Sequence, residues 1–295
     1  MDFDFSDDQE QLRDAVRRWV DKAYGFERRR AIVAGGGFDR AAYGELAGLG
    51  LTALTVPEAH GGLGQGAVDA MLAMEELGRG IVLEPLAQTF IATGVLARCA
   101  ADAVQAAWLP RIASGAALVV LAQQERKARY RLDVCESKAA SAQGGYALTA
   151  HKSIVNAGDQ ADAWLVPAQL GGAIALFLVE KGARGVKCQG YGLQDGGRAA
   201  ELQLADAPAT LVTQDGLAAL ELAQDIGIAA SCAYAVGVMD QTVRLTADYL
   251  NQRRQFGVPI ASFQALRHRM ADMKMQLELA RSMSYYASLK LGAPA

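Results

Sequence analysis

Residues 251–264 read NQRRQFGVPIASFQ, and this stretch separates two helical patterns in the C-terminal part of the chain. The pattern over residues 217–254 predicts one long helix, with two arginines in its last turn and Gly257 just beyond it. A second helix is predicted from residue 262, because apolar side chains then recur at spacings of three and four. These side chains belong to Phe263, Leu266, Met270, Met273, Leu277 and Ala280. The stretch therefore predicts a hairpin of two helices.

The arginines of this stretch admit two interpretations. Positive side chains at a helix C-terminus compensate the helix dipole, and the glycine and proline that follow end the helix. Alternatively, Arg253 grips a diphosphate with two parallel N–H donors and Phe256 packs on a flat cofactor. Gln264, at the start of the next helix, would then meet the same ligand. The residues alone leave both interpretations open.

The middle of the chain reads as a β domain over residues 117–212. Short apolar or alternating runs bounded by turns predict its strands. The runs lie at residues 118–121, 146–148, 163–166, 174–179 and 201–204.

The N-terminal part is helical. Ser6 and Gln9 form a capping box at the first helix. Further helical patterns lie at residues 40–49, 67–79, 85–99 and 101–112, the last interrupted by Pro110. Helices, then strands, then helices predict an α+β fold rather than alternating βαβ units. The predicted domains are residues 1–116, 117–212 and 213–295.

Composition narrows the class of protein. Hydrophobic residues make up 52% of the 295 residues, enough to fill a large core. A net charge of −3 argues against nucleic-acid binding, which needs a concentrated basic surface. The longest apolar stretch, residues 226–239, is too short to span a membrane, and the acidic N-terminus lacks a signal sequence. We therefore expect a cytoplasmic protein without membrane contact. The cysteines and histidines lack ligand spacing, so we expect buried thiols and no metal site.

Arg253, Phe256, Gly257 and Gln264 match R-x-x-F-G followed by Q, and with this signature the chain resembles the acyl-CoA dehydrogenase family. Other stretches resemble the family in the right order, so that the resemblance covers nearly the whole chain. These are FDFSDDQEQLRDAVRRWV (3–20), LTALTVPEAHGGLGQGAVDAMLAMEELGR (51–79), HKSIVNAGDQADAWLV (151–166) and ALFLVEKGARGV (175–186). Residues 233–273 are most similar to the small-subunit type of pimeloyl-CoA dehydrogenase, which works beside a large subunit.

The resemblance implies an N-terminal helical domain, a central β-barrel-like domain and a partial C-terminal helical domain. FAD would lie between the β domain and the C-terminal helices, and a neighbouring subunit would supply part of its site. The resemblance further implies that Arg253 holds the FAD diphosphate, with Phe256 and Gln264 beside it.

The same resemblance assigns flavin contacts in the β domain. Backbone groups of Leu121, Gln123 and Gln124 would touch the isoalloxazine edge. Ile154 and Asn156 fall where the family often has an aromatic residue and a Thr or Ser near flavin N5.

Two stretches depart from the family. QQERKARY (123–130) replaces the usual T-E-P-G-x-G-S-D and begins a basic cluster, which is either a solvated loop or a site for CoA phosphates or a dicarboxylic acyl tail. The cluster comprises Arg126, Lys127, Arg129 and Arg131. Family chains also carry more helices after the hairpin, with the usual catalytic Glu among them, so we expect a chain truncated at its C-terminus. Some members place the base on the long helix, where this chain has Gly227, which cannot act. Asp225 is the only nearby acid and a weak candidate, because the favoured interpretation is a charge near the helix N-terminus.

The function that the resemblance implies is FAD-dependent α,β-dehydrogenation of an acyl-CoA thioester, by a subunit of a dimer-based homo- or hetero-oligomer. Electrons would leave to an electron-transfer flavoprotein. One alternative is a non-catalytic, flavin-supporting subunit of a heteromeric acyl-CoA dehydrogenase, and another is a flavin oxidase or monooxygenase on the same fold. A base elsewhere in the chain would favour the first function, and hydrogen peroxide formed on turnover would favour the oxidase.

Overall fold

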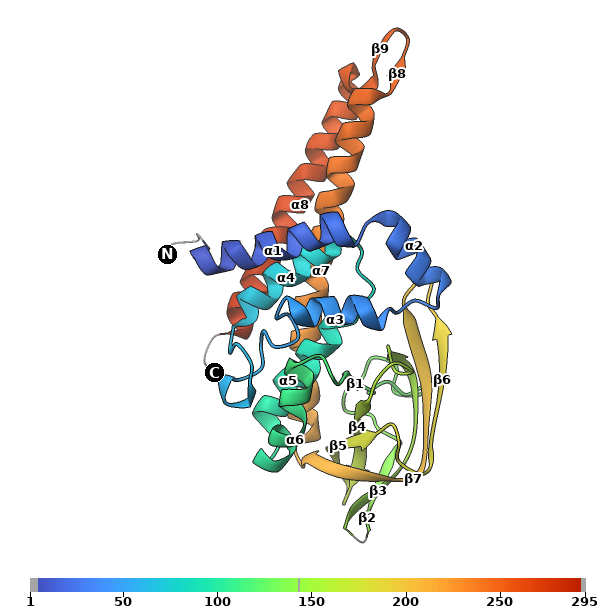
Figure 1. The fold of residues 1–295 in the computed structure, drawn as a ribbon. Coiled ribbons are helices and arrows are strands. Elements are labelled where there is room, and N and C mark those ends of the chain that lie inside the picture. The colour runs from blue at the N-terminus through green and yellow to red at the C-terminus, as the bar shows by residue number, and fades with distance from the viewer. Residues whose placement is uncertain (1–4, 143, 293–295) are drawn as a thin grey trace. The chain divides into compact units, whose positions relative to one another are not determined.

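The computed structural model describes residues 5–142 and 144–292 (Figure 1). The chain divides into two compact units. One unit joins residues 1–26, 67–82 and 228–295, and the other joins residues 27–66 and 83–227. Residues 1–4 and 293–295, at the ends of the predicted terminal domains, lie outside the described residues. The division into three domains stays a prediction.

The first unit is helical. It contains α1 (Asp7–Ala23), α4 (Ala67–Arg79), the part of α7 (Gly216–Gln252) from Ile228 onward, and α8 (Gln264–Leu291). The predicted capping box is confirmed, since Ser6 Oγ accepts from the Gln9 backbone at 3.2 Å and the Gln9 side chain accepts from the Ser6 backbone. Arg281 on α8 bonds Glu75 on α4 and Asp240 on α7, so ion pairs join three helices of this unit.

A β-hairpin connects α7 to α8 (Figure 1). Its strands are β8 (Arg254–Gln255) and β9 (Val258–Pro259), and η2 (Ile260–Ser262) follows. Phe256 and Gly257 form the turn with φ values of 53° and 79°, the left-handed conformation that suits a two-residue hairpin loop. The prediction that both arginines lie in the last turn of the helix is therefore wrong. Helix α7 ends at Gln252, because the Arg253 carbonyl accepts from Ile260 across the hairpin.

The second unit is built around a seven-stranded sheet in which β3, β6 and β7 run side by side (Figure 1). Its strand order is β1-β4-β2-β3-β7-β5, and a further β4–β5 pairing closes the sheet into a barrel-like ring. The strands are β1 (Val119–Leu121), β2 (Lys138–Ala142), β3 (Gly145–Asn156), β4 (Ala163–Leu170), β5 (Ala173–Glu180), β6 (Val186–Gly192) and β7 (Arg198–Thr213). The α+β fold with a central barrel-like sheet is thus confirmed.

Strands β2 and β6 were not predicted. Four of the five residues of β2 are exposed, and β6 mixes polar residues with glycine, so neither carries an apolar run. Each forms by pairing with a neighbour, β2 mainly with β3 and β6 with β7. Pairing with the strand that follows in the chain, rather than an apolar pattern of their own, decides these two strands.

The helices of the second unit are α2 (Phe26–Ala34), α3 (Arg40–Gly48), η1 (Glu58–His60), α5 (Leu86–Cys99) and α6 (Asp102–Ala113), together with the start of α7. Helix α2 begins at the boundary residue of the two units and was not predicted. Pro110 does not interrupt α6, contrary to the sequence prediction. It lies in the last turn of α6, which continues past it to Ala113.

Within residues 5–142 and 144–292, only α7 is long and apolar enough to cross a membrane by length and composition. The expectation that the apolar stretch is too short to span a membrane rested on residues 226–239, whereas the helix that contains them has 37 residues. The core helix of a soluble protein meets the same criterion, so one such helix is weak evidence for a membrane span. The prediction of four buried thiols holds for Cys135 alone: Cys99 and Cys188 are half-buried, and Cys232 is exposed on α7, because an apolar helical pattern does not tell which face is covered.

Candidate functional site

The structure brings together two of the segments predicted to contact a flavin. Gln123 and Gln124 follow β1, and Ile154 lies near the end of β3. The carbonyl of Gln124 accepts from the backbone N–H of Ser153 at 2.8 Å. The residues before Glu125 and the residues around Ile154 are therefore neighbours on the barrel.

Ile154 has an unusual backbone. Its φ is 52°, and its register with β7 is irregular between Lys152 and Val155. A β-branched residue at positive φ is a genuine outlier, and such strain is found at functional sites. Ile154 is also 52% exposed, so the irregularity presents a large apolar side chain to solvent. Asn156, two residues on, is exposed as well.

The segment after β1 has open backbone donors. Leu121 donates to the Gln88 side chain at 3.1 Å, and Ala122 donates to the Leu165 carbonyl at 2.8 Å. Among the described residues, no hydrogen-bond partner is found for the backbone N–H of Gln123 or Gln124, although both residues are half-buried. Half-buried donors without partners are costly unless a ligand or water accepts from them. They fit the acceptor atoms at the edge of a flat heterocycle such as a flavin.

A buried ion pair, which the sequence analysis did not identify, lies directly beside these residues. Lys152 is 0% exposed, and its Nζ lies 2.6 Å from Oε1 of Glu125, which is 3% exposed. Lys152 also donates to the carbonyl of Pro167 on β4 at 2.8 Å. Strand periodicity contained a signal for it, because Leu148 and Ala150 point inward and the next inward position is a lysine.

Further hydrogen bonds hold the Glu125 carboxylate. Its Oε1 accepts from the Ser137 backbone at 3.2 Å and the Ser137 hydroxyl at 2.6 Å, and Oε2 accepts from the Glu136 backbone. Burial raises the pKa of Glu125, but the Lys152 ammonium and these donors outweigh it and lower the pKa to about 2. The carboxylate is therefore ionised at neutral pH, and so the pair is a true ion pair.

The other predicted cofactor residues lie in the helical unit, at and after the β8–β9 hairpin. Arg253 is exposed, and no hydrogen-bond or ion-pair partner for its guanidinium is found within the described part of the chain. Phe256 is 91% exposed at positive φ, with its ring 6.1 Å from that of Phe263 in an edge-to-face arrangement. Gln264 is exposed as the first residue of α8. An unpaired guanidinium beside an exposed aromatic ring suits an anionic, flat ligand.

A cavity of about 580 Å³ opens beside this hairpin. Its lining is apolar apart from a few polar side chains, which include Arg267. It comprises Ala247, Leu250, Asn251, Pro259, Ala261, Ser262, Arg267 and Met270.

The basic cluster after Glu125 is largely neutralised. Arg126 lies 3.8 Å from Glu201, Lys127 lies 2.7 Å from Glu136, and Arg131 lies 2.6 Å from Asp133. Of the four cations only Arg129 has no carboxylate within ion-pair distance in the described ranges. This pairing favours the interpretation as a solvated loop.

Neither candidate position on α7 resembles a buried general base. A Cβ built on Gly227 would lie 3.1 Å from Cδ1 of Ile91, so α5 leaves little room there. Asp225 is exposed. The role of Asp225 stays a prediction that the geometry does not support.

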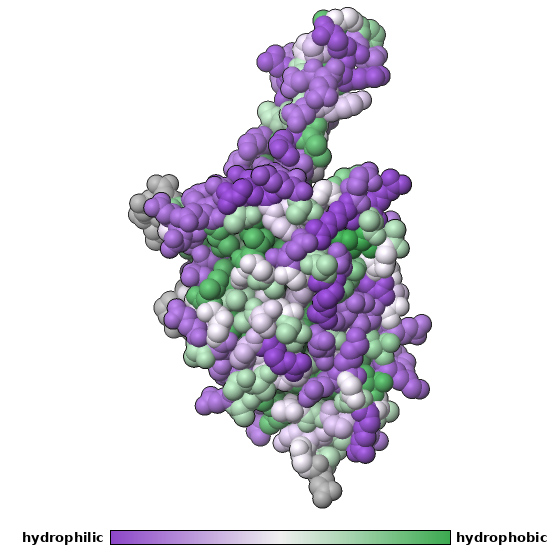
Figure 2. Space-filling view, in the orientation of Figure 1, coloured by the Kyte–Doolittle hydropathy of each residue, from purple (hydrophilic) through white to green (hydrophobic). Residues whose placement is uncertain are grey.

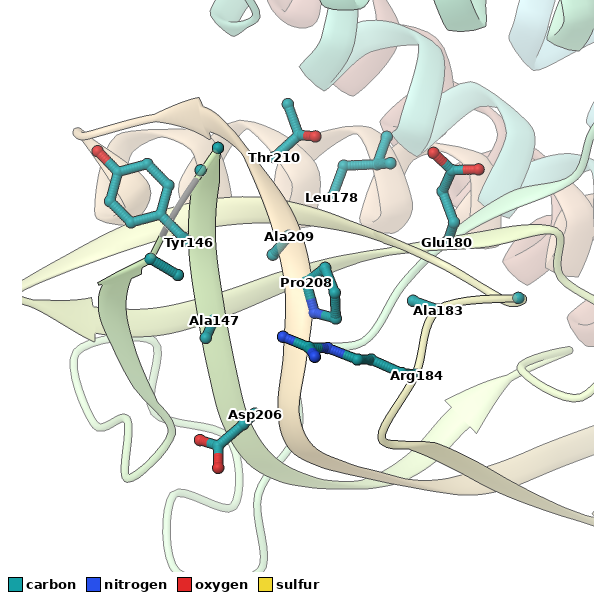
Figure 3. Close-up of a pocket in the computed structure, with 14 residues that line it drawn as sticks. Tyr146, Ala147, Leu178, Glu180, Ala183, Arg184, Asp206, Pro208, Ala209 and Thr210 are labelled. Carbon is teal, nitrogen blue, oxygen red and sulfur yellow. The ribbon is translucent and has the colours of Figure 1, made fainter.

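A second cavity, of about 480 Å³, lies on the barrel and contains none of the predicted site residues (Figure 3). Strands β3, β5 and β7 line it, and Arg184 extends from the loop after β5 toward Pro208 on β7 (Figure 3). Its charged side chains, Glu180, Arg184 and Asp206, are all exposed, so the cavity is a shallow polar hollow.

Comparison with known proteins relates the chain to one family. Residues 6–116 match the family model "Acyl-CoA dehydrogenase, N-terminal domain", and residues 215–293 match "Acyl-CoA dehydrogenase, C-terminal domain". Acyl-CoA dehydrogenase FadE27 of Mycobacterium tuberculosis is 30% identical over 239 residues, which are 80% of this chain and 62% of FadE27. The chain thus spans less than two thirds of the length of that relative.

Solved structures of similar proteins agree with this family. The ChsE4-ChsE5 complex from Mycobacterium tuberculosis contains a chain that is 28% identical, with a TM-score of 0.85 over 97% of this chain and 79% of that one. The structure of PigA with FAD and proline has a TM-score of 0.89 at 22% identity, over 98% and 80% of the two chains, and it supports the fold alone. The closer likeness to the pimeloyl-CoA type stays a prediction. With both terminal domains matched over more than half of its length, the chain belongs to the acyl-CoA dehydrogenase family.

Proposed function

We propose that this chain is an FAD-binding subunit of an acyl-CoA dehydrogenase, which removes hydrogen from the α and β carbons of an acyl-CoA thioester. The observation that carries the proposal is the strained, exposed Ile154 beside the unpaired donors of Gln123 and Gln124. The segment after β1 supplies two unpaired donors next to the apolar side chain at the end of β3, a combination that a bound heterocycle requires. PigA, which shares the fold, has been solved with FAD.

Two groups of residues would bind different parts of FAD. When bound, FAD supplies the acceptor for the β-hydride. The N–H groups of Gln123 and Gln124 bind the ring edge, with the backbone of Leu121 beside them, while Ile154 and Asn156 lie next to the ring. We propose that Arg253, Phe256 and Gln264 bind the diphosphate half of the FAD held by a neighbouring subunit, because all three are exposed at and after the hairpin.

The substrate, electron acceptor and location belong to the same proposal. We propose an acyl-CoA substrate, an electron-transfer flavoprotein as the partner that removes electrons, and a cytoplasmic location. The family assignment supports the class of substrate and leaves the acyl chain unspecified.

A second function is favoured by the absence of a side chain at Gly227. In this alternative the chain supports the flavin, and a longer partner subunit supplies the base that takes the α-proton. The ChsE4-ChsE5 complex, one of the structural relatives, contains two different subunits by its name. The experiment that separates the two functions compares the chain with and without such a partner.

Replacing Arg253 by alanine should weaken FAD binding by about 1.5–3 kcal/mol, because a charge-assisted bond to the diphosphate is lost. Calorimetry with the apoprotein measures this change. Arg254→Ala is the matched control, since Arg254 is the adjacent arginine and its guanidinium already bonds the Gly257 carbonyl within the hairpin. Equal affinity in the wild-type protein and the Arg253→Ala variant would contradict the assignment.

The chain should form an oligomer, because α8 carries a long exposed apolar face. Exposed apolar surface on this scale marks protein interfaces. In Figure 2 scattered green apolar residues lie among mostly purple ones along α7 and α8. The α8 residues are Met275, Leu279, Met283, Tyr286 and Leu289, each more than half exposed.

Light scattering at micromolar concentration should therefore report a dimer or a multiple of it. The double variant Leu279→Arg/Met283→Arg should shift the distribution toward monomer, since it introduces two charges into the apolar face. A control with Lys274→Arg, on the same helix but off this face, should leave the distribution unchanged. A monodisperse wild-type monomer would exclude the assembly.

A further inference from the structure

The buried ion pair of Glu125 and Lys152 is not explained by stability alone, because a buried ion pair contributes little net stability. Removing two charges from water costs several kcal/mol per ion, and apolar replacement of both partners is often neutral or stabilising. Here both side chains are at least 96% buried and are fully supplied with partners. A pair of this kind is better explained by the geometry that it imposes.

The pair joins segments that no continuous strand pairing holds together. Strand β1 ends at Leu121, and its pairing with β4 ends there as well. Residues 123–125 then run on with one backbone bond to β3, from Ser153 to the Gln124 carbonyl. The Glu125–Lys152 contact adds a second, charged link to β3, and the bond from Lys152 to Pro167 extends that link to β4.

The linked residues flank the proposed flavin contacts. Glu125 directly follows Gln123 and Gln124, which carry the unpaired donors, and Lys152 precedes the strained Ile154 by two residues. A shift of Glu125 relative to Lys152 would therefore change the direction of the donors relative to the apolar contact. Binding that relies on both requires them to be held to within a fraction of an ångström.

We propose that Glu125 and Lys152 are a positioning pair, which holds the backbone donors of Gln123 and Gln124 in register with Ile154 for binding the isoalloxazine of FAD. This inference rests on the proposed function, since it assumes that these residues bind FAD. Neither side chain needs to touch the cofactor. The pair acts through the two segments that it joins.

The test is the double variant Glu125→Gln/Lys152→Met, which removes both charges but keeps an acceptor for Ser137 and an unbranched chain at position 152. The expected result is an apoprotein whose melting temperature stays close to that of the wild type. Its dissociation constant for FAD should rise roughly tenfold or more, the equivalent of one lost hydrogen bond. The visible circular dichroism of the bound flavin should change, because its orientation is no longer fixed.

A control is Glu76→Gln/Arg79→Met, which removes a buried ion pair of the helical unit at 2% and 9% exposure; the glutamine keeps an acceptor for Arg17, the second partner of Glu76. It should leave the FAD dissociation constant and spectrum unchanged. The inference is overturned if the Glu125/Lys152 variant folds and binds FAD with wild-type affinity and spectrum. If that variant does not fold, Glu125→Asp replaces it in the test. Its shorter carboxylate should weaken FAD binding and alter the spectrum of the bound flavin. Wild-type affinity and spectrum in Glu125→Asp would overturn the inference. A wild-type chain that binds no FAD would instead refute the proposed function.

Discussion

Holoprotein made from this chain alone should be reduced by acyl-CoA about 10²–10⁴-fold more slowly than the same chain beside a subunit that carries a carboxylate base. Hydride transfer from the β carbon needs removal of the α-proton, and general base catalysis typically contributes a factor of this size. In this structure Gly227 has no side chain, Ile91 crowds the position, and Asp225 is exposed. An exposed carboxylate lacks the desolvated surroundings that raise the pKa of a catalytic base.

The measurement is anaerobic stopped-flow absorbance of the flavin after mixing with a panel of straight-chain and dicarboxylic acyl-CoAs. Rapid bleaching by the chain alone, lost in Asp225→Asn, would show that Asp225 is the base and that this prediction is wrong. Rapid bleaching that survives the substitution would place the base on another residue of this chain. Absence of bleaching with a longer partner present would leave the chain a supporting role only.

Replacing Lys152 alone should be one of the most destabilising changes in the chain. Lys152→Met leaves the Glu125 carboxylate buried without its counter-charge, and the expected cost is about 3–5 kcal/mol at neutral pH. Acidification should relieve part of this cost, because protonation neutralises the isolated carboxyl group. Urea unfolding at neutral and acidic pH measures both effects. A loss below about 1 kcal/mol would mean that water reaches the carboxylate, and that the pair is not buried in solution.

The stability of the wild-type protein should fall on acidification, whereas acidification relieves part of the stability loss in Lys152→Met. The pKa of Glu125 is lowered from 4.5 to about 2 on folding, so the ionised form is favoured in the folded state. The resulting stability, about 3 kcal/mol, is fully present above about pH 5 and is lost as the pH falls toward about 2. The difference in unfolding free energy between the wild type and Glu125→Gln/Lys152→Met should change by this amount over the same range. Parallel curves for the two proteins would contradict the assignment.

Local sequence pattern by itself determined several helices of this protein and its family. The capping box of Ser6 and Gln9, helix α4 and the long helix α7 follow from short-range periodicity and end signals, and the structure reproduces them within a few residues. These elements depend on interactions between residues three or four positions apart, which the sequence displays directly. The family likewise follows from motifs that are each continuous in the chain.

Tertiary structure alone decided the rest. Strands β2 and β6 carry no apolar pattern and form because the strands that follow them, β3 and β7, pair with them, and the φ of 52° at Ile154 arises from an irregular register with β7. Glu125 and Lys152 are 27 positions apart, and the alternation of β3 indicates an inward lysine at position 152 but not its partner. Their burial follows only once the barrel closes around them, because the desolvation of a charge depends on every element packed against it and not on its neighbours in sequence.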